Sequence, residues 1–93
     1  MIKIVGNDIW RGGQKIGWIH GDDIYDHRGQ KIGYFTADGD IYNREGKKLG
    51  YLDGEYVKTV SGESMRLSDN RRAIQGGSAS DTARAAVRIL LGE

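Results

Sequence analysis

The chain contains no cysteine and no proline among its 93 residues. Without cysteine, disulfides, thiolate metal sites and thiol nucleophiles are excluded together. Without proline, the 15 glycines cannot belong to a collagen-like helix. Isoleucine, tyrosine and tryptophan are well supplied, which argues against a disordered linker. The length predicts one small domain with a modest core.

The sequence also lacks an excess of charge of one sign and any long apolar run. Fourteen basic residues stand against 13 acidic ones, so the formal net charge is +1 and no global field attracts nucleic acid or anionic lipid. No stretch is long enough for a signal peptide or a membrane span, and no lipidation motif is present. We therefore expect no membrane partner and a cytoplasmic location.

An internal repeat is the main feature that the sequence does contain. Three similar segments cover residues 9–18, 24–34 and 41–51, and a degraded fourth copy covers residues 56–67. A turn glycine recurs every 16 or 17 residues, at Gly13, Gly29, Gly46 and Gly62. The fourth copy has Arg66 in place of the mid-strand glycine and Leu67 in place of the aromatic residue.

Two kinds of turn alternate along these copies. Asp26–Gly29 and Asn43–Gly46 have Asp or Asn first and Gly fourth, which predicts a type I turn closed by a left-handed glycine. Two-residue turns of the primed type are predicted at the junctions between copies, at Asp38-Gly39 and Asp53-Gly54 and at the equivalent Gly6-Asn7 and Gly21-Asp22. Each copy is therefore a hairpin, and residues 2–67 form a continuous antiparallel meander.

Alternation along the strands predicts which side chains share a face. In the second copy one face has Ile24, Ile32 and Tyr34, and the other has Tyr25, Lys31 and Gly33. We expect the aromatic ring of this second face to cover the bare backbone of the mid-strand glycine. A register slip of one residue would exchange the two faces.

Single hairpins of this length are marginal in water, so the hairpins must bury their apolar faces together. The repeated unit Ile-Tyr-Asp/Asn-x-x-Gly-x-Lys-Ile/Leu-Gly-Tyr resembles the four-fold β-flower domain of small bacterial proteins. The resemblance covers roughly residues 2–67. It implies a mainly β fold of four β-hairpin repeats around a pseudo-four-fold axis, and it implies no established activity. An open meander of eight or nine strands is the competing geometry.

The composition changes after this repeat domain, which we place at residues 1–67. Residues 68–77 are predicted to be a connector, and residues 78–93 to contain a C-terminal amphipathic α-helix over roughly 79–91. Ser78, followed three residues later by Asp81, is typical of a helix start, and Gly92 of a helix end. The apolar stripe of this helix consists of Ala83, Ala86, Val87 and Leu90. This stripe either packs on the same domain or joins two copies into a homo-oligomer.

No group of residues in the sequence indicates a catalytic, cofactor or metal site. His20 and His27 fall at a connector and in a turn, and the aspartates near them lack calcium-loop spacing. No serine has nucleophile-elbow context, and neither glycine pair belongs to a phosphate loop. We expect no enzyme activity and no cofactor.

One face of the predicted sheet is a candidate binding surface. It alternates aromatic residues with lysines, at Trp10, Lys15, Tyr25, Lys31, Tyr42 and Lys48. Rings interleaved with lysines can stack bases and follow phosphates, so single-stranded nucleic-acid binding is one hypothesis. The other interpretation is a solvated face whose lysine stems cover the rings. The sequence favours a non-enzymatic binding or assembly module of unknown partner, with nucleic acid as the alternative.

Overall fold

The computed structural model describes residues 2–76 and 79–92. The described residues form ten strands and two helices, in the order β1 (Ile2–Val5), β2 (Asp8–Arg11), β3 (Gln14–His20), β4 (Asp23–Asp26), β5 (Lys31–Phe35), β6 (Asp40–Asn43), β7 (Lys48–Asp53), β8 (Tyr56–Thr59), β9 (Ser64–Arg66), α1 (Leu67–Ala73), β10 (Ile74–Gln75) and α2 (Asp81–Leu91).

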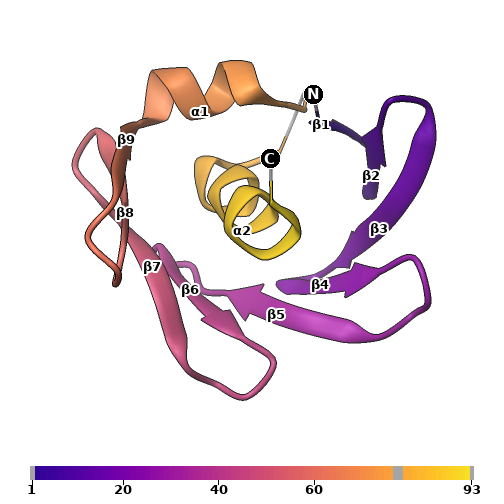
Figure 1. Cartoon of the computed structure of the whole chain (residues 1–93), viewed down its shortest axis with the longest axis horizontal. Helices are drawn as coiled ribbons and strands as arrows, with labels where there is room; N and C mark the ends of the chain where they lie inside the picture. Colours follow the sequence, from indigo (N-terminus) through magenta and orange to yellow (C-terminus); the bar gives the residue numbers. More distant parts are fainter. Residues whose placement is uncertain (1, 77–78, 93) are drawn as a thin grey trace.

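The strands make one sheet that curves around α2 (Figure 1). Neighbouring strands pair in antiparallel fashion from β1 to β9, whereas β10 pairs with β1 in parallel, with Ile74 opposite Ile2. Helix α1 connects β9 to β10 and completes the ring around α2 (Figure 1). The prediction of a mainly β fold with a C-terminal helix is confirmed. Among the described residues β9 and β10 form the two edges of the sheet and do not pair with each other, so the ring is closed by α1 and not by strand pairing.

The number of units in the ring differs from the sequence prediction. The four predicted copies correspond to the pairs β2–β3, β4–β5, β6–β7 and β8–β9. In the described residues a fifth pair, β10–β1, joins positions 74 and 2. The four-fold count is therefore not confirmed. No local sequence pattern predicts this pair, because no turn connects its two strands.

The bulged turns agree with their sequence prediction. Gly29 and Gly46 have φ values of 85° and 86°, in the left-handed region. Asp26 Oδ1 accepts hydrogen bonds from the backbone N–H groups of Arg28 and Gln30, at 2.9 and 3.0 Å. Asn43 Oδ1 makes the same pair of bonds in the next copy, both at 2.9 Å. Each side chain thus holds its own turn in shape.

The turns between copies agree only in part. Gly6-Asn7 and Gly21-Asp22 are two-residue turns, as predicted. The two-residue turn between β7 and β8 is Gly54-Glu55, one position later than predicted. Asp38-Gly39 belongs to a longer turn, in which the backbone N–H of Gly39 bonds the carbonyl of Thr36 and that of Thr36 bonds the carbonyl of Asp40.

A β-bulge in each of the first three hairpins changes the predicted faces. In the second hairpin Ile24 lies opposite Gly33 and Tyr25 lies opposite Lys31, which leaves Ile32 as the extra residue. The bulge turns Ile32 and Gly33 toward the core and leaves Tyr34 outside. The prediction that Tyr34 shares a face with Ile24 is therefore wrong, as is the placing of Gly33 with Lys31.

The mid-strand glycines lie against the next strand and against α2. A Cβ on Gly33 would be 2.6 Å from Leu90 Cδ1, and a Cβ on Gly50 would be 2.8 Å from Ile89 Cδ1. A Cβ on Gly17 would collide with the carbonyl oxygen of Tyr25. The three atoms nearest to each added Cβ are backbone or aliphatic atoms, and none belongs to an aromatic ring. The glycines leave room for the helix and for neighbouring backbone.

The segment after the repeats is more ordered than predicted. Most of the expected connector, residues 68–77, is α1 and β10. Helix α2 begins at Asp81, and its capping residue is Ser80, whose hydroxyl accepts a 3.0 Å bond from the N–H of Ala83. Ser78 lies outside the described residues. Gly92 ends the helix with a φ of 71°, as its sequence position predicted.

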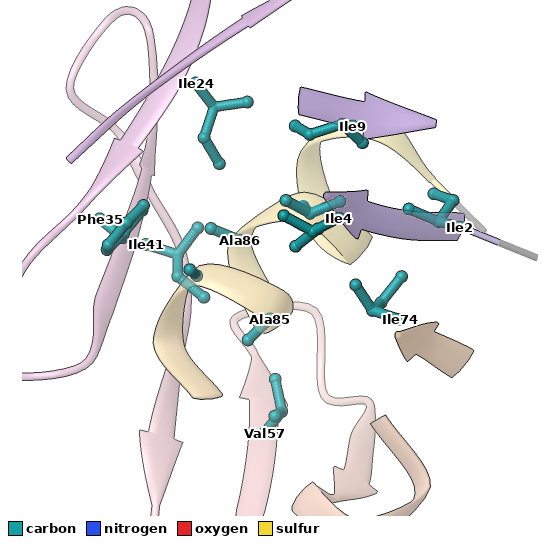
Figure 2. Close-up of a cluster of buried hydrophobic side chains, with 12 residues drawn as sticks. Ile2, Ile4, Ile9, Ile24, Phe35, Ile41, Val57, Ile74, Ala85 and Ala86 are labelled. Carbon is teal, nitrogen blue, oxygen red and sulfur yellow. The ribbon is translucent and has the colours of Figure 1, made fainter. Parts of the chain in front are cut away.

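The core fills the space between the ring and α2. Every repeat supplies an isoleucine or valine that is fully or almost fully buried, and Figure 2 shows these side chains pointing toward Ala85 and Ala86 of α2. The small alanines allow the helix to lie close to the sheet. The inner face of the ring is therefore occupied by the chain's own helix, and only the outer face and the two rims face solvent.

Candidate functional site

The outer face of the ring has a repeated cluster of an aspartate, a lysine and an aromatic ring. Lys31 Nζ is 3.0 Å from Asp23 Oδ1 and 4.9 Å from the centroid of the Tyr34 ring. The other hairpins repeat this arrangement, with Lys15 between Asp8 and Trp18 and with Lys48 between Asp40 and Tyr51. Lys58 of β8 makes a different ion pair, at 2.8 Å, with Asp53 at the end of the preceding strand, β7.

Two of these contacts, at Lys48 and Lys58, favour the charged form of the lysine. A hydrogen bond from Lys48 to the Asp40 carboxylate raises the pKa of Lys48 above its usual range. Asp53 has the same effect on the pKa of Lys58. The ammonium groups of Lys15, Lys31 and Lys48 already have both an anionic partner and a ring face, so a phosphate must compete with both.

Two predicted aromatic residues of this face, Tyr25 and Tyr42, lie in stacked pairs with rings that simple alternation along the strands places on the opposite face. Tyr25 stacks on Trp18, with centroids 5.6 Å apart and planes 10° apart. Tyr42 stacks on Tyr34, with centroids 5.0 Å apart and planes 18° apart. Trp18 and Tyr34 were missed because the bulges shift the alternation by one residue. A bulged turn predicted from the sequence could have signalled this shift.

Trp10 is the predicted ring with a different neighbour. It lies opposite Lys15 of β3, just as Tyr25 and Tyr42 lie opposite a lysine in their own hairpins. On its other side it lies opposite Lys3 of β1. It lines an apolar groove of about 520 Å³ together with Lys3, Val5, Gly12, Gly13 and Gln75. The six residues of the candidate face thus lie on one surface. Tyr25 and Tyr42 are each in a stacked ring pair, whereas Trp10 is next to Lys3.

A second groove lies at the rim of the ring, beside the β8–β9 turn and the end of α2. Its volume is about 560 Å³. The half-buried or buried side chains of Leu49, Val57, Met65 and Ile89 line it. Val60, which is 57% exposed, and the cation of Arg88 lie at its edge. No sequence pattern predicts this groove, since its residues come from distant segments.

The four residues of the candidate assembly stripe lie inside the ring. Ala83, Ala86 and Val87 are at most 5% exposed. Leu90 is half-buried and packs against Gly33. A contact with a second copy through this stripe would require α2 to leave the ring.

The remaining polar candidates have structural partners or stay at the surface. Asp81 accepts two hydrogen bonds from Arg71, at 2.8 and 2.7 Å, which tie α2 to α1 and lower the pKa of Asp81. His20 and His27 are exposed. Within the described residues no group of three or more His, Asp or Glu side chains is arranged to hold a metal ion. Neither described helix has the length and hydropathy to cross a membrane.

Comparison with known proteins gives one match. A family described as "5-fold beta-flower protein" matches residues 3–86. The match includes the four hairpins, α1, β10 and the first half of α2. The five-fold description agrees with the five strand pairs of the ring and corrects the four-fold count. No curated protein and no solved structure matches the chain.

Proposed function

The chain belongs to the 5-fold beta-flower family, and because this membership specifies a fold and no reaction, we propose that the protein is a non-enzymatic binding module. The observation that carries the proposal is the rim groove, defined by Leu49, Val57, Val60, Met65, Arg88 and Ile89. It combines an apolar lining with an exposed valine at its edge, and such concave apolar surfaces are the usual places for ligands.

The partner that fits this groove best is a short extended peptide with one apolar side chain. The apolar lining would take that side chain. The exposed Ser61 and Ser64 at the edge offer hydroxyls to a peptide backbone. Arg88 and Glu63 put one charge of each sign beside the groove, so the charge of the flanking residues would contribute to selection.

The absence of catalysis in this proposal is supported by the roles that the polar groups already have. Asp26 and Asn43 hold turns, and Asp8, Asp23 and Asp40 hold lysines. Catalytic groups usually combine a pocket with strongly shifted proton affinity. Here, among the described residues, none of the groups with a shifted pKa lines either groove.

The experiment is an NMR titration of the ¹⁵N-labelled full chain with two capped hexapeptides that differ only in a central leucine or aspartate. We expect the leucine peptide to shift the signals of Val60, Met65 and Ile89, and the aspartate peptide to shift them much less. Val60→Asp should abolish the shifts. Val5→Asp is the matched control, because Val5 is similarly exposed, at 53%, and does not line the groove. Equal shifts in both variants, or none with either peptide, would reject the proposal.

A further inference from the structure

The outer face has a lysine in place of an aromatic ring at two of its four junctions between strand pairs, where Lys3 lies opposite Trp10 and Lys58 lies opposite Tyr51. Trp18 of β3 lies opposite Tyr25 of β4, and Tyr34 of β5 lies opposite Tyr42 of β6, each as a stacked pair. The equivalent position opposite Trp10 is in β1 and is Lys3. Among the described residues no aromatic ring stacks on Trp10.

The place of the missing ring is an open apolar groove. It is the groove of about 520 Å³ lined by Lys3, Val5, Trp10, Gly12, Gly13 and Gln75. Gly12 and Gly13 add no side chain beside the Trp10 ring, and Val5 remains 53% exposed. A planar ring that entered here could stack on the indole of Trp10, as Tyr25 stacks on Trp18 and Tyr42 stacks on Tyr34.

Lys3 gives this groove a charge that the other lysines of the outer face do not offer. Lys15, Lys31, Lys48 and Lys58 each have an aspartate within 3.0 Å. In the part of the chain that the structure describes, no carboxylate forms an ion pair with Lys3, which is exposed. An anionic group on the incoming ring would supply the missing partner.

We propose that this groove binds a small planar aromatic molecule that carries a negative charge, with its ring stacked on Trp10 and its anionic group paired with Lys3. Two sources share this chemistry, namely nucleotides and aromatic carboxylates. Binding here is independent of the rim groove, because the two grooves share no residue.

The test follows the indole N–H signals of the ¹⁵N-tryptophan-labelled full chain. The ligands are adenosine 5′-monophosphate and indole-3-acetate, with adenosine, indole-3-acetamide and inorganic phosphate as matched controls. We expect both charged rings to shift the Trp10 signal. The neutral counterparts should bind up to about tenfold more weakly, and phosphate alone should cause no shift. Trp18 provides the internal control, because Tyr25 already covers its ring.

Three variants separate the parts of the proposal. Lys3→Gln should reduce the binding of each charged ligand to that of its neutral counterpart. Lys3→Tyr should restore the missing ring, weaken binding by about tenfold or more and raise the melting temperature. Lys58→Gln, on the far side of the ring, should leave binding unchanged.

Whichever of the two charged ligands binds more tightly would show whether nucleotides or aromatic carboxylates are the class of ligand that this groove binds. The proposal is overturned if the charged rings shift Trp10 and Trp18 equally. It is also overturned if Lys3→Tyr binds as well as the original chain, or if neither charged ring shifts Trp10 at 10 mM, on the order of the weakest affinity that stacking and one ion pair should give.

Discussion

Leu90 of α2 lies directly over Gly33 of β5, so close that a Cβ on this glycine would be 2.6 Å from Leu90 Cδ1. The same Cβ would be 2.5 Å from the carbonyl oxygen of Tyr42. The glycine is therefore a packing requirement of the helix and of the neighbouring strand at once.

We expect Gly33→Ala to lower the free energy of unfolding by about 1–3 kcal/mol, because the methyl group overpacks the core. Urea denaturation of the full chain measures the change. Gly33→Ala combined with Leu90→Ala should couple non-additively, since the second change removes one of the two collisions. Gln14→Ala, at an exposed strand position, is the control. A loss below about 0.5 kcal/mol would contradict the packing described for Gly33.

The turn carboxylate Asp26 predicts a specific pH dependence. The hydrogen bond from the backbone N–H of Gln30, aided by that from Arg28, lowers the pKa of Asp26. The stabilisation from this carboxylate is therefore complete above its unfolded pKa of 3.8 and is lost as the pH falls through the lower folded value.

Asp26→Asn should keep the turn, as Asn43 does naturally, and should flatten the acid limb of stability below about pH 4. Asp26→Ala should be less stable than Asp26→Asn at pH 7, because both side-chain hydrogen bonds are lost. Thermal unfolding between pH 2.5 and 7 measures both effects. An acid limb in Asp26→Asn as steep as in the original chain would show that other carboxylates dominate it.

Because the alanines of α2 are buried, enlarging one of them should show whether the helix packs in the core or joins two copies of the chain. Ala86→Leu should destabilise the protein by about 1–3 kcal/mol, because Ala86 is 0% exposed inside the ring. Light scattering should give the same mass for the variant and the original chain. Thr82→Ala is the control on the same helix. A change of mass that accompanies Ala86→Leu would favour the assembly hypothesis.

The ion pairs of the outer face predict weak binding of nucleic acid. We expect no measurable affinity for a single-stranded oligonucleotide at 150 mM salt, because each of Lys15, Lys31 and Lys48 is held by an aspartate. Asp8→Asn, Asp23→Asn and Asp40→Asn together should raise the affinity at 20 mM salt. Fluorescence anisotropy measures both. Tight binding by the original chain at either salt concentration would restore the nucleic-acid hypothesis.

Local sequence signals predicted local structure well. The Asp or Asn before each turn glycine identified the bulged turns, and the alanine-rich stripe identified α2 to within two residues at its start. The candidate lysines and rings were placed on one surface because their cross-strand pairs lie beside these turns.

Non-local and irregular features could not be predicted in the same way. Pairing of Ile2 with Ile74 depends on contacts between distant segments. Helix α1 has no apolar period, and its one buried side chain among the described residues is Asn70. The bulge at Ile32 shifts every later side chain of β5 by one, which moved Tyr34 to the outer face. The rim groove likewise combines residues of β7, β8, β9 and α2, which are distant in the sequence.

The pairing of β10 with β1 also determines when the fold can form during synthesis. Strand β1 is synthesised before the rest of the sheet. One of the two strands that pair with it, β10, is formed by residues 74–75, and the helix that covers its buried side is formed by residues 81–91. At a translation rate of about 5–20 residues per second, synthesis from the end of the fourth hairpin to the end of α2 takes on the order of one to five seconds. During that interval the isoleucines of the inner face remain exposed, and the nascent chain is most vulnerable to aggregation.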